Sequence, residues 1–210
     1  MGHASQLLDS DPSDAPLHLA VLASGSGSNF EALVEALRRE PRLQIVLLVV
    51  NRDGCGAQQR ADRLGIPCQL VDHTDFESRE QVDMAVVQAL QKAGVELVVM
   101  AGWMRIVTPV LIRPFHGRLL NIHPSLLPAF RGMHAIRQAL AAGVSHTGCT
   151  VHEVVEDVDA GPVLGQSKVL IQADDDEVSL SARIHSAEHQ LLPAVVIRKG
   201  LSLLRERAQG

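Results

Sequence analysis

The chain has 210 residues, a formal net charge of −5 and a pI near 6.0. Its 19 basic residues are scattered and aromatic residues make up only 2% of the chain, which argues against a sequence-independent grip on nucleic acid. The three cysteines, Cys55, Cys68 and Cys149, lie far apart and form no Cys-x-x-Cys pair, so we expect a reduced, cytoplasmic protein without a disulfide framework.

Residues 1–16 combine acidic and small polar residues, with no basic start and no sustained apolar run. This composition excludes a signal peptide and predicts a disordered leader. Farther along, no apolar run approaches the ~20 residues that a membrane-spanning helix requires. We therefore expect one folded domain over residues 17–210, without membrane contact.

The apolar run over residues 17–23 ends in the turn Gly25-Ser26-Gly27-Ser28-Asn29, and apolar residues at helical spacing follow it. This order predicts a strand, a turn and a helix. The alternation continues, with strands expected over 44–50, 68–71, 97–101 and 119–123 and helices over 55–64 and 82–93. Strands that are apolar on both faces and alternate with helices predict a doubly wound, mostly parallel α/β sheet of the Rossmann-like kind.

The C-terminal third has a different pattern. We expect a helix over 134–142, two alternating segments over 147–155 and 162–171, and a long helix over 178–198. The two alternating segments predict antiparallel additions to the sheet. No internal repeat or linker marks a second domain.

Asn121 and His123 lie two residues apart on the strand expected over 119–123. Residues i and i+2 of a strand project to the same face, so both side chains can enter one cavity while Leu120 and Ile122 face the core. This strand ends at the sheet edge where open α/β sheets bind ligands. The alternative is a strand end that merely carries two polar residues into a turn.

The turn Gly25-Ser26-Gly27-Ser28-Asn29 can present several backbone N–H groups at the positive end of a helix. Such a turn suits a phosphate group, because its two glycines permit close approach. A dinucleotide site of the G-x-G-x-x-G type would need a third glycine where Phe30 stands, so a monophosphate is favoured. A purely structural turn is the remaining alternative.

The segment Trp103-Met104-Arg105-Ile106-Val107 follows the strand over 97–101 at the same sheet edge. It offers polarizable apolar surface with one cation, which can hold a flat heterocycle. The alternative is that Met104 and Ile106 are ordinary core residues.

Asp159 lies in a turn made by Gly161 and Pro162, and such a loop can return a carboxylate to His123. A carboxylate beside an imidazole fixes its orientation and raises its pKa, as acid–base work near neutrality requires. Glu156 and Asp157 represent the alternative, an acidic turn that is simply solvated.

The pattern His185-Ser186-Ala187-Glu188-His189 matches the H-x-x-E-H signature of inverted zinc peptidases, with two histidines on one helix face. Short patterns of this kind arise by chance and no obvious third ligand follows. We therefore expect no metal site.

Four segments taken together resemble the phosphoribosylglycinamide formyltransferase family, and the likeness covers residues 17–204. They are Gly25-Ser26-Gly27-Ser28-Asn29, Ala101-Gly102-Trp103-Met104-Arg105-Ile106, the segment 117–128, and Asp157-Val158-Asp159-Ala160-Gly161-Pro162. The resemblance implies the formyltransferase version of the Rossmann-like fold. It also implies transfer of the formyl group of 10-formyltetrahydrofolate, the co-substrate, to glycinamide ribonucleotide in purine biosynthesis. No metal is implied, and a homodimer is compatible with the family.

The family's functional residues carry over position by position. Asn121, His123 and Asp159 match its catalytic trio. The resemblance assigns the ribonucleotide to Gly27, Ser28, Asn29, His185, Ser186, Ala187 and Glu188, with Glu188 accepting hydrogen bonds from the ribose. It assigns the folate to Arg79, Met104, Arg105, Ile106, Val107, Asn121, Val155, Glu156, Asp157, Val158 and Asp159.

This sequence departs from the family's pattern at two places. Trp103 stands where many relatives have Phe, and Phe130-Arg131 replaces a Tyr-Pro pair in the loop after the catalytic strand, so the departures concern the folate pocket and leave the trio unchanged. A formyltetrahydrofolate hydrolase would use the same trio with water as acceptor, but we expect that class to carry a regulatory domain before the first strand. A methionyl-tRNA formyltransferase would carry a C-terminal RNA-binding domain. A non-catalytic nucleotide-binding module would keep the glycine turn and have no use for the trio.

Overall fold

A computed structural model describes residues 15–209, so the leader expected over residues 1–16 lies, except for its last two residues, outside the described part. The strands are β1 (Leu17–Ala23), β2 (Leu43–Val50), β3 (Cys68–Leu70), β4 (Leu97–Met100), β5 (Leu119–His123), β6 (His146–Glu153) and β7 (Val163–Leu170). The α-helices are α1 (Ser28–Leu37), α2 (Gly56–Leu64), α3 (Arg79–Lys92), α4 (Pro109–Ile112), α5 (Ala135–Ala141) and α6 (Glu177–Arg207), and two short 3₁₀ turns are His73–Asp75 and Arg113–Phe115.

All these strands form one sheet in the order β3-β2-β1-β4-β5-β6-β7. The pairs from β3 to β5 are parallel, whereas β5 with β6 and β6 with β7 are antiparallel. The predicted doubly wound, mostly parallel sheet with antiparallel additions is thereby confirmed.

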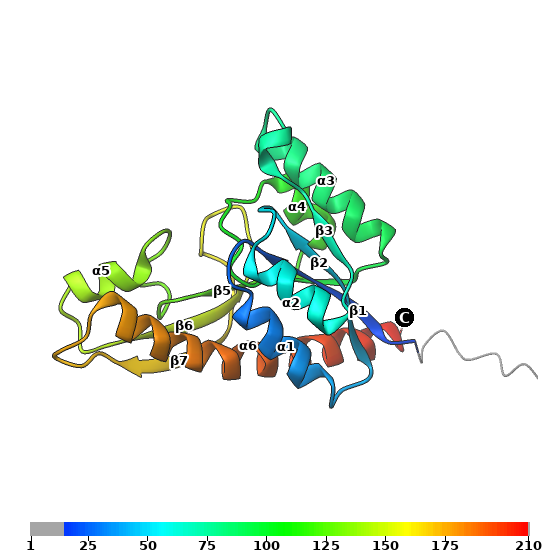
Figure 1. The fold of residues 1–210 in the computed structure, drawn as a ribbon. Coiled ribbons are helices and arrows are strands. Elements are labelled where there is room, and N and C mark those ends of the chain that lie inside the picture. Colours follow the sequence, from blue (N-terminus) through cyan, green and yellow to red (C-terminus); the bar gives the residue numbers. More distant parts are fainter. Residues whose placement is uncertain (1–14, 210) are drawn as a thin grey trace, which may run out of the picture.

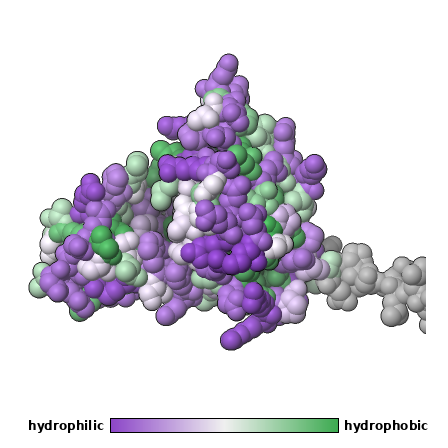
Figure 2. Space-filling model, in the orientation of Figure 1, coloured by the Kyte–Doolittle hydropathy of each residue, from purple (hydrophilic) through white to green (hydrophobic). Residues whose placement is uncertain are grey.

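Helices cover both faces of the sheet (Figure 1), and an apolar core lies beneath the helices on each face. Along β1, Leu19 and Val21 belong to the core under α1, α2 and α6, whereas Ala20 and Leu22 belong to the core under α3 and α4. This alternation is the period of two that a strand buried on both faces requires. The outer surface over α1 and α2 is largely hydrophilic, and the molecule is indented between these helices and the part that carries α5 (Figure 2).

The chain leaves β1 toward β2 on one side and returns through α3 to β4 on the other. This reversal of strand order between β1 and β4 is a topological switch point, where open α/β sheets bind ligands outside the carboxyl ends of their strands. In the neighbouring strand β5, Asn121 pairs with Met100 of β4. The candidate residues of β5 therefore lie beside the switch point.

Two elements differ from the prediction. Helix α6 does not end at residue 198 but continues to Arg207, with Pro193 inside it. Its last turns are retained because Leu203 and Leu204 still pack against the core. Helix α4 was not expected; it begins because the Thr108 hydroxyl accepts from Val110 N–H and Pro109 occupies its first turn, a favourable start for a helix. Among residues 15–209, no helix is long and apolar enough to cross a membrane.

Candidate functional site

The loops that follow β1 and β4 are joined to each other at the switch point. Ser24 N–H donates to the Gly102 carbonyl at 3.0 Å, and Met104 N–H donates to Ser24 Oγ at 2.9 Å. Ser24 is buried, so its hydroxyl is a fixed acceptor rather than a solvated one. The glycine turn and the Trp103–Val107 segment are therefore neighbours, as their common sheet edge predicted.

The glycine turn packs directly against the start of α2. Gly27 has a φ of +76°, and a Cβ at this position would lie 2.5 Å from Ala57 Cα. A Cβ on Gly56 would in turn lie 2.7 Å from the Ser26 carbonyl oxygen. In contrast, nothing lies within 4 Å of a Cβ on Gly25. Gly27 is thus required by backbone conformation and packing, whatever the turn binds.

The first turn of α1 opens toward α6. Gly27 is its N-cap and supplies no side-chain hydrogen bond, which suits the binding of an anion by free N–H groups. At the second residue of the helix, Asn29 Nδ2 donates to Glu188 Oε2 at 2.8 Å. Asn29 and Glu188 are both buried, and Asn29 Oδ1 has no partner in the described part of the chain. An unpaired buried oxygen of this kind is an acceptor awaiting a donor.

Glu188 also holds His185, whose Nδ1 lies 2.8 Å from Glu188 Oε2. The hydrogen bond to this carboxylate raises the pKa of His185, against an opposing effect of burial. For His189, burial dominates and lowers the pKa. No group of three or more His, Cys, Asp or Glu side chains within residues 15–209 could hold a metal ion. Within the H-x-x-E-H pattern, Glu188 pairs with His185 on α6 and, through Asn29, joins α6 to α1.

Asn121, His123 and Asp159 meet at the end of β5. His123 Nδ1 lies 3.3 Å from Asp159 Oδ2, and Asn121 Nδ2 lies 3.5 Å from Asp159 Oδ1. The side chains of His123 and Asp159 are 7% and 10% exposed, so their interaction is little screened by solvent. The loop after β6 does return a carboxylate to the imidazole, as the Gly-Pro turn suggested.

A third side chain near Asp159 is that of His152, which the sequence analysis did not single out. His152 Nε2 lies 3.4 Å from Asp159 Oδ1 and 3.2 Å from Asn121 Nδ2, and its side chain is 2% exposed. It reaches this position because β6 pairs antiparallel with β5 and places His152 opposite Asn121. Only the pairing register of β6 with β5 could have identified His152, and the order of residues along β6 does not reveal that register.

Asp159 is held in its ionised form by its neighbours. Burial alone would raise the pKa of this carboxyl, but hydrogen bonds from His152 and Gly132 N–H, together with the charge of His123, lower it below its usual value. The Gly132 N–H bond measures 2.9 Å. Asp159 has a φ of 51°, a left-handed conformation that Asp tolerates better than most residues. A fixed anion therefore faces the imidazole.

Both ring nitrogens of His123 face oxygen acceptors. Nδ1 faces Asp159 Oδ2, and Nε2 lies 2.8 Å from the Phe130 carbonyl oxygen. The ring is therefore held between Asp159 on one side and the 129–134 segment on the other.

Apart from Asn121 on β5, the residues that the resemblance assigns to the folate lie in the loops after β4 and β6 and, for Arg79, at the start of α3. Met104, Ile106 and Val158 are 73%, 53% and 45% exposed, which rules out the alternative that Met104 and Ile106 are core residues. Arg105, Val107 and Val155 are partly buried. Glu156 lies 3.7 Å from Arg113, and Asp157 is exposed. Arg79 is exposed at the first residue of α3.

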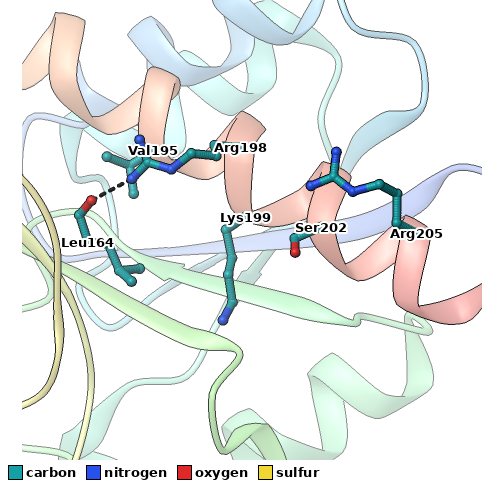
Figure 3. A pocket seen from close by; sticks show the side chains of 6 residues that line it. All are labelled: Leu164, Val195, Arg198, Lys199, Ser202 and Arg205. Atoms are coloured by element: carbon teal, nitrogen blue, oxygen red, sulfur yellow. Dashed lines mark hydrogen bonds between the residues drawn. The ribbon is translucent and has the colours of Figure 1, made fainter.

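A separate hollow of about 320 Å³ lies between α6 and β7 (Figure 3). Three of its lining residues are cations, but Arg198 donates to the Leu164 carbonyl and Lys199 Nζ lies 2.8 Å from Glu153 Oε1. Those two cations are already engaged, and the residues predicted to be functional lie elsewhere.

Comparison with known proteins agrees with this architecture. The family model described as formyl transferase matches residues 17–196. The chain belongs to the formyl transferase family, and the predicted resemblance is confirmed.

Within that family the chain is similar to proteins of two names. It is 42% identical to phosphoribosylglycinamide formyltransferase of Mycobacterium tuberculosis over 185 residues, which are 88% of this chain and 86% of that protein. It is 46% identical to the trifunctional purine biosynthetic protein adenosine-3 of Drosophila melanogaster over 178 residues, which are 83% of this chain. The match spans only 13% of that much longer protein.

A solved structure gives the same picture of the fold. The crystal structure of phosphoribosylglycinamide formyltransferase from Bacillus halodurans superposes with a TM-score of 0.82 at 40% identity, covering 85% of this chain and 92% of that chain.

Proposed function

We propose that this protein transfers the formyl group of 10-formyltetrahydrofolate to the amine of glycinamide ribonucleotide, giving formylglycinamide ribonucleotide and tetrahydrofolate. The observation that carries the proposal is the convergence of Asn121, His123 and Asp159 beside a glycine turn suited to a phosphate. The names of its relatives support the same reaction.

In the proposed reaction, the amine attacks the formyl carbon and the carbonyl oxygen becomes an oxyanion. Donors aimed at the position of that charge stabilise the transition state. A ring N–H of His123 and the Asn121 amide supply such donors, and Asp159 fixes the orientation of the imidazole. The intermediate then collapses as the bond between the carbon and N10 breaks, and a proton moves from the attacking nitrogen to N10. Asp159 assists that transfer through water.

The Phe130 carbonyl occupies the hydrogen bond that His123 Nε2 would offer to the formyl oxygen. We infer that the formyl oxygen replaces this acceptor when both substrates are bound. Holding the two substrates side by side supplies the proximity that a bimolecular transfer needs, so the proposed mechanism needs no metal.

The ribonucleotide occupies the side of the site formed by α1 and α6. Its phosphate binds the N–H groups of Gly27, Ser28 and Asn29 at the start of α1, to which His185 is linked through Glu188 and Asn29. Glu188 accepts hydrogen bonds from the ribose hydroxyls. The folate lies on the other side, against Met104 to Val107 and the 155–159 loop. The cytoplasmic location and the homodimer expected from the sequence stay predictions.

The test is a transfer assay with purified protein, 10-formyltetrahydrofolate and glycinamide ribonucleotide, in which the absorbance of the released folate is followed. We expect release that depends on the nucleotide. Equal release without the nucleotide would identify a hydrolase instead, and no release with both substrates would overturn the proposal. The dephosphorylated substrate should bind much more weakly, and equal affinity would remove the phosphate assignment.

A further inference from the structure

The segment from Trp103 to Thr108, which joins β4 to α4, is anchored at both ends. At its beginning, Met104 N–H donates to the buried Ser24 hydroxyl. At its end, Thr108 N–H donates to Asp83 Oδ2 at 2.5 Å. Between these anchors, Met104 and Ile106 are exposed. The segment therefore holds two apolar side chains in solvent by fixing the backbone on either side of them.

Asp83 is an unusual residue for its position. It is 1% exposed on α3, where it lies among the buried valines Val82, Val86 and Val87. Burial raises the pKa of its carboxyl, and the Thr108 hydrogen bonds and the charge of Arg105 act in the opposite direction. A buried carboxylate is costly unless it is paired, and an apolar side chain would pack on this helix face equally well. The packing of α3 alone does not account for Asp83.

Asp83 lies one helical turn after Arg79, so the two residues share a face of α3. Arg79 belongs to the residues assigned to the folate, and so does the segment that Asp83 anchors. We propose that Asp83 is a positioning residue for the folate co-substrate, acting through Thr108 N–H to fix the Met104–Val107 segment relative to Arg79. This inference rests on the proposed function.

The proposal predicts a selective kinetic effect. Asp83→Ala removes the acceptor and leaves the Thr108 N–H unpaired, so the segment loses one of its two anchors. We expect KM for 10-formyltetrahydrofolate to rise about tenfold, while kcat and KM for glycinamide ribonucleotide change less than threefold. Asp83→Asn retains an oxygen that can accept from Thr108 N–H, so it should restore most of the folate affinity.

Val86→Ala is the matched control, because it truncates a buried side chain of the same helix and retains the Asp83 carboxylate that accepts from Thr108 N–H. It should lower stability and leave KM for the folate at the wild-type value. An equal rise of this KM in Val86→Ala would show that Asp83 acts only through the stability of α3. An equal rise of both KM values in Asp83→Ala would likewise overturn the proposal.

A second readout does not depend on activity. Trp103 is the only tryptophan of the chain and lies at the start of the same segment, 6% exposed. In the protein without ligands, Asp83→Ala should red-shift the Trp103 emission and at least double its quenching by acrylamide, whereas Val86→Ala should do neither. A wild-type spectrum and quenching constant in Asp83→Ala would overturn the anchoring role. Absence of formyl transfer by the wild-type protein, with the spectral change present, would instead count against the proposed function.

Discussion

Replacing Gly27 by Ala tests whether the glycine turn is required by the fold as well as by a ligand. The new Cβ would lie 2.5 Å from Ala57 Cα and 2.8 Å from Ala57 Cβ. Both atoms belong to the start of α2, whose backbone cannot move without disturbing its contact with Ser26. The residue would also have to keep a φ of +76°. The substitution therefore combines a strained backbone with overpacking.

The expected loss follows from these two costs. A left-handed conformation of a residue with a Cβ costs about 1–2 kcal/mol, and overpacking a tight contact costs about 1–3 kcal/mol. Together they predict a decrease of about 2–5 kcal/mol in the free energy of unfolding. For a chain of this length, that corresponds to a fall of roughly 4–20 °C in Tm.

Gly25→Ala is the matched control in the same turn, since nothing lies within 4 Å of the position that its new Cβ would take and its φ is not positive. Its free energy of unfolding should stay within about 0.5 kcal/mol of the wild type. Urea unfolding followed by far-ultraviolet circular dichroism measures both variants. Wild-type stability of Gly27→Ala, or an equal loss in Gly25→Ala, would refute the packing argument.

Three further outcomes follow from the site. His123→Ala and Asp159→Asn should each lower kcat for formyl transfer by about 10²–10⁴-fold. Their far-ultraviolet circular dichroism should stay that of the wild type, and the surface change Asp174→Asn is the control. Wild-type kinetics in both variants would contradict the assigned roles. The pKa of His185 is raised in the folded state by Glu188, so its contribution to stability is complete below its unfolded value of 6.5 and is lost as the pH rises through the folded value. His185→Gln should therefore destabilise the protein more at pH 6 than at pH 9 in urea titrations, and an equal loss at both would exclude this linkage. Burial and the charge of Glu188 raise the pKa of Cys149 to about 12, so iodoacetamide at pH 8 should label it only after unfolding, as mass spectrometry of the peptides would detect.

The pattern of apolar residues was sufficient to predict most strands of the sheet. Residues 17–23 and 119–123 were predicted as strands and are β1 and β5. Each lies in an apolar run bounded by a clear turn, so local signals and tertiary packing agree. The end of α6 was wrong by nine residues because Leu203 and Leu204 pack against residues distant in the chain. Contacts of that kind cannot be read from the spacing of apolar residues along the helix itself.

The site was only partly predictable for the same reason. Asn121 and His123 share a face because a strand has a period of two, which any two residues at this spacing obey. The proximity of Asp159 required a long loop to fold back, and the Gly-Pro turn suggested it without determining where it would end. His152 and Asp83 were missed because the contacts of each depend on another element. His152 lies opposite Asn121 of β5, and Asp83 accepts from Thr108 N–H at the start of α4.

The glycine turn shows why motif and fold are hard to separate in this protein. Gly27 satisfies a left-handed backbone and the contact with Ala57, and the same conformation exposes the first N–H groups of α1. Packing and the proposed phosphate binding would thus both require glycine at position 27, and Gly27 alone does not distinguish the two. Asn29 does distinguish the two, because its Oδ1 is buried without a partner in residues 15–209 although its Nδ2 donates to Glu188. A turn needed only for packing has no use for that free acceptor, whereas a bound ribonucleotide can supply its donor.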